Sequence, residues 1–70
     1  MKSNELRGRI VAQGMTVGEF CERYGFVRST FDRKLTGKSE FDRGEIERII
    51  AALDLTQEET RNIFFADGVA

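Results

Sequence analysis

The chain has 70 residues, of which 40% are apolar, and its formal net charge is −1 with one cysteine and no histidine. This length predicts a single domain over residues 1–70, and the apolar content is too high for a disordered tail. One cysteine excludes an intramolecular disulfide, and the lack of histidine and further thiols excludes a zinc site and a nucleophile–base pair. We therefore expect no metal, no cofactor and no enzymatic activity.

Hydropathy indicates a helical chain without a membrane segment. No apolar run approaches the ~20 residues that span a bilayer, and the first residues do not form a signal peptide. Proline is absent, and valine and isoleucine never alternate with polar residues over the length of a strand. The sequence therefore predicts an all-α protein with no membrane partner, and its single cysteine fits a cytoplasmic, reducing location.

The charges are unevenly distributed. Residues 23–43 carry six basic and three acidic side chains, whereas residues 54–70 carry one basic and four acidic ones. The total charge argues against a nucleic-acid partner, because domains that bind phosphate backbones are typically basic. The basic middle segment argues for one, although solvation of helix surfaces explains most of these charges as well.

The first predicted helix covers about residues 4–13. Ser3 or Asn4 can cap its start, Leu6, Ile10 and Val11 form an apolar stripe, and Gly14 ends it. Two arginines at positions 7 and 9 point away from this stripe.

The second predicted helix covers 17–24. Thr16 and Glu19 have the spacing of a capping box, and Met15 can pack on Phe20 across it. The apolar side of this helix includes Cys21, which we interpret as a small core residue rather than a nucleophile.

A turn at 25–27 leads into a third predicted helix over 28–35. Gly25 can adopt the positive φ with which the preceding helix stops. Phe31 and Leu35 form the apolar side of the third helix. Its other side chains can donate or accept hydrogen bonds at the edge of a base pair, and these are Arg28, Ser29, Thr30, Asp32 and Arg33.

Two further helices are predicted over 43–53 and 57–65, each preceded by a capping box. The loop at 36–41 begins with Thr36 and Gly37, which can end the third helix, and Phe41 anchors the loop in the core. Three adjacent apolar residues, Ile63, Phe64 and Phe65, cannot share one side of a short helix. At least one of them either folds back on the core or meets another subunit. The predicted core consists of Leu6, Ile10, Phe20, Cys21, Phe26, Phe31, Leu35, Ile46, Ile49, Ile50 and Leu53.

The segment 16–37 resembles the helix-turn-helix of the lambda-repressor/Cro superfamily, specifically the short XRE-type, Cro-like regulators of phages and bacteria. The family pattern is a small residue in the middle of the first motif helix, a turn glycine, an aliphatic residue after it and a branched apolar residue in the second motif helix. Cys21, Gly25, Phe26 and Phe31 stand at those places. The flanking helices extend the resemblance over about residues 3–65. It implies a compact five-helix lambda-repressor-like DNA-binding domain with a central helix-turn-helix.

Three positions depart from the family pattern. Val27 stands where a serine or threonine usually caps the second motif helix, so this cap is either lost or moved to Ser29. Val17 stands where many relatives carry a polar residue that touches phosphate. Lys34 replaces a frequently apolar residue, which leaves Leu35 to pack alone.

The resemblance implies a sequence-specific transcriptional regulator, more often a repressor, that binds a near-palindromic operator of double-stranded DNA through the major groove. The base-reading residues are then Arg28, Ser29, Thr30, Asp32 and Arg33, with Asp32 either accepting from cytosine or only orienting Arg28. The phosphate-binding residues are Thr16, Thr36, Lys38, Ser39 and Arg43. Arg7 and Arg9 either lie along the DNA backbone or are solvated.

A homodimer is also implied, because one short helix contacts too few base pairs for specificity. We place its contact at Ile63, Phe64 and Phe65, and we expect it to be either weak or completed only on DNA. No small-molecule ligand is indicated. The alternative hypothesis is that the same fold serves as a protein-interaction module without DNA binding, which the net charge, Val17 and Asp32 favour.

Overall fold

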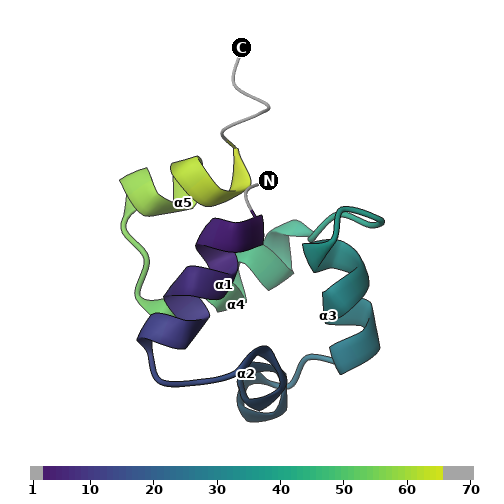
Figure 1. The fold of residues 1–70 in the computed structure, drawn as a ribbon. Coiled ribbons are helices and arrows are strands. Elements are labelled where there is room, and N and C mark those ends of the chain that lie inside the picture. The colour runs from purple at the N-terminus through teal and green to yellow at the C-terminus, as the bar shows by residue number, and fades with distance from the viewer. Residues whose placement is uncertain (1–2, 66–70) are drawn as a thin grey trace.

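The computed structural model describes residues 3–65, and within this range the chain forms five α-helices and no strand. The helices are α1 (Ser3–Ala12), α2 (Val17–Tyr24), α3 (Arg28–Leu35), α4 (Arg43–Leu53) and α5 (Gln57–Phe64). Their bounds confirm the all-α prediction, with shifts of one residue at the ends of α1 and α5. Figure 1 shows α1 near the centre, α2 below it, α3 to its right and α5 above it.

Three helices begin with the capping boxes that the sequence predicts. The side chains of Thr16, Asp42 and Thr56 accept a hydrogen bond from the backbone N–H three residues later. In each box the glutamate at that third position accepts from the N–H of the capping residue. α3 differs from these three helices, because Val27 precedes it and forms no side-chain cap bond. No bond from Ser29 replaces that cap among the described residues.

The core contains most of the predicted residues. The buried apolar side chains are Leu6, Ile10, Met15, Phe20, Cys21, Phe31, Leu35, Ile49, Leu53, Leu55 and Ile63. Three residues predicted to be in the core, Phe26, Ile46 and Ile50, are only partly buried. Phe26 lies in the turn between α2 and α3, where the guanidinium of Arg48 covers its ring. In α4 the buried residues are Ile49 and Leu53. The prediction that Val11 belongs to the apolar stripe of α1 is wrong. Val11 is 64% exposed, since it lies about 100° around the helix from the buried Ile10.

A row of phenylalanines connects the helices. Phe20 of α2 contacts Phe26 and Phe31, with ring centroids 5.8 Å apart in each case. Phe31 of α3 contacts Phe41 at 5.3 Å, and Phe41 contacts Phe64 of α5 at 6.0 Å. The prediction that Phe41 anchors the 36–41 loop is therefore confirmed, and the same row joins α2 and α3 to α5. None of the helices within residues 3–65 is both long and apolar enough to span a membrane.

Candidate nucleic-acid interface

The turn between α2 and α3 is fixed by its backbone. Gly25 has φ 77° and ψ 27°, and its N–H donates to the carbonyl of Cys21. The N–H of Phe26 donates to the same carbonyl at 2.9 Å. A side chain at Gly25 would be strained because of this positive φ. The turn places α3 directly after α2, and the two helices pack closely.

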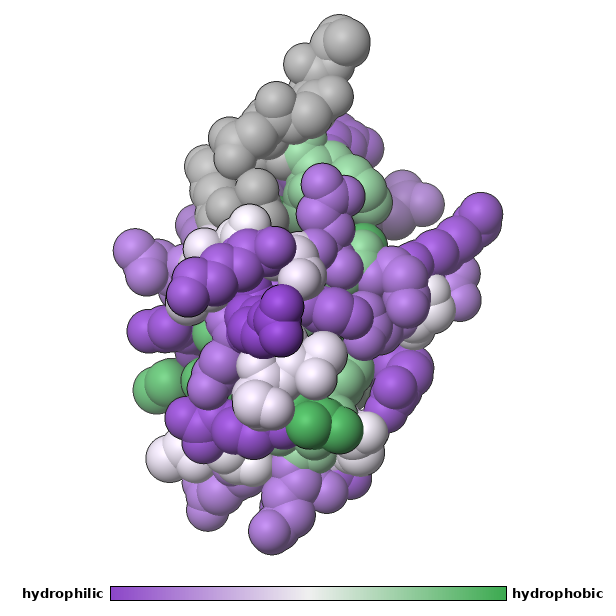
Figure 2. Space-filling view, turned by 90° about the vertical axis from the view of Figure 1, so that its right-hand side faces the viewer, coloured by the Kyte–Doolittle hydropathy of each residue, from purple (hydrophilic) through white to green (hydrophobic). Residues whose placement is uncertain are grey.

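α3 has one buried and one exposed side. Phe31 and Leu35 are fully buried, which orients the helix on the core. The residues of the predicted base-reading set are exposed, apart from Asp32, which is half-buried. Figure 2, which views the molecule from the α3 side of Figure 1, shows a surface that is mainly hydrophilic. The structure therefore brings the predicted base-reading residues together on accessible surface.

Arg28 and Asp32 form an ion pair within α3. Arg28 Nε lies 3.2 Å from Asp32 Oδ2, and both side chains remain about half exposed. The guanidinium also lies over Gly18 at the start of α2, where an added Cβ atom would be 2.5 Å from Arg28 Nη1. In the free protein Asp32 thus orients Arg28, which was one of the two roles predicted for it. No ion pair to Arg33 occurs among residues 3–65.

The predicted phosphate-binding residues lie at two places along the chain. Thr16 is at the start of α2, and the others are in the loop after α3 and in the first turn of α4. Lys38 is exposed and forms no ion pair within the described residues. Arg43 is also exposed, with Nε 3.4 Å from Glu47 Oε2. The hydroxyl of Thr36 donates to the carbonyl of Arg33 at 3.1 Å, so it would have to give up this bond to donate to a phosphate.

Backbone N–H groups add donors to these side chains. The N–H groups of residues 28–30 have no acceptor within residues 3–65, and Val27 has no side-chain acceptor that could satisfy one of them. Such groups at a helix N-terminus favour anions or water. They lie at the end of α3 that also holds Arg28.

Two groups of contacts were not predicted from the sequence. Lys34 Nζ lies 2.6 Å from Glu45 Oε1 and 2.7 Å from Oε2, which joins α3 to α4. Arg48 of α4 donates to the carbonyl of Tyr24, and its guanidinium carbon lies 4.2 Å from the centre of the Phe26 ring. The partners in these contacts are 11 and more residues apart, so no local pattern indicates them. Leu35 does pack without help from Lys34, which points to Glu45 instead of the core.

Arg9 forms an ion pair with a residue of α5. Its Nη1 lies 2.7 Å from Glu59 Oε2. The backbone N–H of Thr56 donates to the same carboxylate and, with a smaller contribution from Arg9, lowers the pKa of Glu59. Arg7 is exposed.

The predicted dimer contact needs one correction. Ile63 is fully buried in the core of its own chain, so its side chain is not available to a second subunit. The register of α5 accounts for this, since neighbouring residues point about 100° apart. Phe64 is half-buried against Phe41, and Phe65 is 48% exposed. A surface hollow of about 430 Å³ lies between these two phenylalanines and Ile46 of α4.

The thiol of Cys21 lies in the core. Cys21 is 1% exposed, and burial raises the pKa of its thiol, against a smaller opposing effect of Arg28. A thiol in this state is a poor nucleophile. Within residues 3–65, no group of three or more histidine, cysteine, aspartate or glutamate side chains is arranged to hold a metal ion.

Comparison with known proteins gives no match: no family model, no curated protein and no solved structure matches this chain.

Proposed function

We propose that the chain is a sequence-specific DNA-binding transcriptional regulator of the lambda-repressor/Cro type, a repressor that acts in the cytoplasm. In this proposal α3 enters the major groove of a near-palindromic operator. The observation that carries the proposal is the division of α3 into two sides. Phe31 and Leu35 are buried, and the polar side chains of residues 28–30 and 33 are exposed beside a close turn.

The chemistry of the exposed side suits base edges. Arginine recognises guanine through two hydrogen bonds, whereas serine and threonine can hydrogen-bond to several different bases. Arg28 and Arg33 therefore carry most of the discrimination between base sequences. Lys38, Arg43 and the hydroxyl groups at positions 16, 36 and 39 would contact phosphates and set the position of the protein on the duplex.

A homodimer completes the proposal. A single α3 contacts few base pairs, and two copies double the contacted sequence. Phe65 is the accessible apolar residue for this contact, with Phe64 and Ile46 beside it in the same hollow. The dimer would be weak, or would form only on DNA, because a small interface must offset several kcal/mol of lost translational and rotational freedom.

The direct test is selection of duplexes from a random library at low salt, followed by affinity measurements on the selected site and on random DNA. Arg33→Ala is expected to cost about 1–3 kcal/mol on the selected site and to relax its sequence preference. Lys38→Ala should weaken selected and random DNA alike and lower the salt slope by about one. Failure of the wild-type protein to bind any duplex at low salt would contradict the proposal.

The second candidate function is a protein-interaction module built on the same fold. The Arg28–Asp32 ion pair favours it, because this pair neutralises one of the two arginines of α3 in the free protein. The selection of duplexes from a random library also distinguishes the two functions. A module without DNA binding gives no enrichment of any duplex sequence, and Asp32→Asn does not change this.

A further inference from the structure

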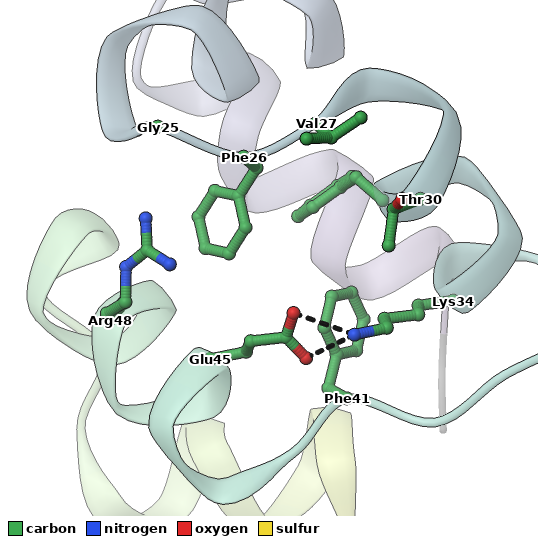
Figure 3. Close-up of a pocket in the computed structure, with 9 residues that line it drawn as sticks. Gly25, Phe26, Val27, Thr30, Lys34, Phe41, Glu45 and Arg48 are labelled. Carbon is green, nitrogen blue, oxygen red and sulfur yellow. Dashed lines mark hydrogen bonds and ion pairs between the residues drawn. The ribbon is translucent and has the colours of Figure 1, made fainter.

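α4 contacts the α2–turn–α3 segment through two charged side chains, Glu45 and Arg48. Figure 3 shows Glu45 projecting from α4 toward Lys34 of α3, and Arg48 projecting toward Phe26 in the turn. They are three residues apart, so they lie on one side of the helix. Between them and the turn is a hollow of about 170 Å³, which is smaller than the ~300–1,000 Å³ of typical ligand sites. The contacts across it are therefore better explained by the arrangement of the helices than by a ligand.

The contact between Glu45 and Lys34 is unusually well shielded for this molecule. The side chains of Lys34 and Glu45 are 16% and 19% exposed, whereas those of the Arg43–Glu47 pair on the same helix are 93% and 65% exposed. Both carboxylate oxygens of Glu45 lie within 2.7 Å of Lys34 Nζ. Exposed ion pairs contribute little, whereas removing one partner of a shielded pair is costly because it leaves the other charge uncompensated.

Glu45 also has a second role. Its Oε1 accepts from the backbone N–H of Asp42 at 2.9 Å, as part of the capping box that begins α4. The carboxylate that starts α4 is thus the one that holds Lys34. The position of α3 is in this way tied directly to the first turn of α4.

Arg48 acts on the other end of the segment. Its guanidinium donates to the carbonyl of Tyr24, the last residue of α2, and lies 4.2 Å from the centre of the Phe26 ring in the turn. It also lies close to Gly25, where an added Cβ atom would be 3.3 Å from Arg48 Nη2. A cation over an aromatic ring is attracted to it, and the planar guanidinium stacks as an ammonium cannot.

We propose that Lys34, Glu45 and Arg48 are positioning residues that set the orientation of α3, and hence of its exposed side chains, relative to the rest of the domain. This inference rests on the proposed DNA-binding function for its effect on specificity. Close helix packing joins α3 to α2, but the backbones of α3 and α4 have few close contacts. The ion pair of Lys34 with Glu45 links α3 directly to α4, and Arg48 links α4 to the end of α2 and to the turn that precedes α3. Lys34 holds its charge against Glu45 and does not contribute to phosphate binding.

The orientation is tested first without DNA. Residual dipolar couplings are measured for the backbone N–H groups of residues 28–35. They are compared with the couplings calculated for α3 from the molecular alignment that is fitted to the other helices. In Lys34→Met and Glu45→Gln we expect the α3 couplings to depart from the wild-type orientation. Glu45→Gln keeps an acceptor for the N–H of Asp42, so the capping box is retained and the variant remains folded. Glu47→Gln is the matched control, since it removes the exposed pair of the same helix, and its couplings should fit the wild-type orientation.

The consequence is then measured on DNA. The ratio of affinities for the selected site and for random duplexes should fall about tenfold in Lys34→Met, the loss expected for one misplaced base contact, with random-duplex affinity nearly unchanged. Lys34→Arg, which keeps the charge, should restore most of the ratio.

Two results would overturn the inference. One is that the α3 couplings keep the wild-type orientation in both Lys34→Met and Glu45→Gln. The other is that Lys34→Met weakens random and selected duplexes equally, which would make Lys34 a phosphate contact. If the wild-type protein binds no duplex, the proposed function fails, and the couplings alone still decide whether these residues orient α3.

Discussion

Capping boxes fix where α2, α4 and α5 begin, whereas α3 begins without one. α2, α4 and α5 each begin at a capping box in which Thr16, Asp42 or Thr56 bonds to a glutamate three residues on. α3 begins after Val27, which is 66% exposed and caps nothing. Three starts are thus specified by four adjacent residues each, whereas the start of α3 depends on the rest of the domain. Among these four helices, α3, which carries the candidate base-reading residues, has the start with the weakest local determination.

Tertiary contacts account for the formation of α3. Phe31 and Leu35 are fully buried, and Phe31 contacts three other phenylalanine rings within 5.8 Å. An eight-residue helix without a cap is not stable alone, so burial must supply its stability. The comparison between α3 and the other helices can therefore be tested by removing, adding or titrating these contacts.

The largest effect is expected from Phe31→Ala. Truncating a fully buried phenylalanine costs about 3–5 kcal/mol, which is a large share of the stability of a small domain. We expect the variant to be largely unfolded, as measured by far-ultraviolet circular dichroism and urea titration. Phe65→Ala is the control, because its side chain is about half exposed and should cost much less. A loss below about 1 kcal/mol for Phe31→Ala would contradict tertiary control of α3.

The next largest effect is expected from removing a cap. Asp42→Ala and Thr56→Ala should each lower the free energy of unfolding by about 1 kcal/mol, because an N–H in the first turn of α4 or α5 loses its acceptor. Ser29→Ala is the matched change in the first turn of α3. It should stay within about 0.5 kcal/mol of wild type, since Ser29 makes no cap bond there. Equal losses for all three variants in urea titrations would remove the distinction between α3 and the other helices.

A smaller effect, of opposite sign, is expected from giving α3 the cap that it lacks. Val27→Thr keeps the shape of the side chain and adds an acceptor for the N–H of Thr30, so the free energy of unfolding should rise by about 0.5–1 kcal/mol. Val27→Ala is the control without an acceptor. Amide hydrogen exchange at residues 28–30 should slow in Val27→Thr only. Unchanged exchange there would mean that the new hydroxyl does not cap the helix.

The same contrast explains what could be predicted from the sequence. The bounds of α2 and α4 follow from capping boxes and the 3.6-residue period, which act over a few neighbouring residues. Gly25 marked the end of α2, and its φ of 77° is the conformation that glycine favours. The exposed residues of α3 followed once Phe31 and Leu35 were assigned to the core.

The missed features depend on residues that are distant in the chain. The sequence assigns Ile63 to a dimer surface although it is buried, because three adjacent apolar residues do not reveal which one the register of α5 turns inward. Lys34 contacts Glu45, which is 11 residues away in the chain, and Arg48 contacts Tyr24, which is 24 residues away. Such pairs form only after the helices have packed, so periodicity contains no information about them.

The smallest expected effect concerns acid and the capping box of α5. The pKa of Glu59 is lowered in the folded protein, chiefly by the N–H of Thr56 and less by Arg9. A lowered pKa means that the folded state favours the carboxylate. Its contribution to stability is therefore full above the ordinary glutamate value of about 4.3 and is lost as the pH falls through the lowered value.

Urea titrations of wild type and Glu59→Gln between about pH 6 and about pH 3 measure this contribution. Glutamine keeps an acceptor for the Thr56 N–H but has no charge, so the stability difference between the two proteins should shrink as the pH falls. Glu58→Gln removes the same charge from the same turn at a residue that takes no part in the capping box, and the pH dependence of its difference should be weaker. A Glu59→Gln difference that stays constant over this range would show that the charge of Glu59 adds nothing to the cap. The start of α5 would then rest on the hydroxyl of Thr56, and its advantage over the uncapped start of α3 would not depend on pH.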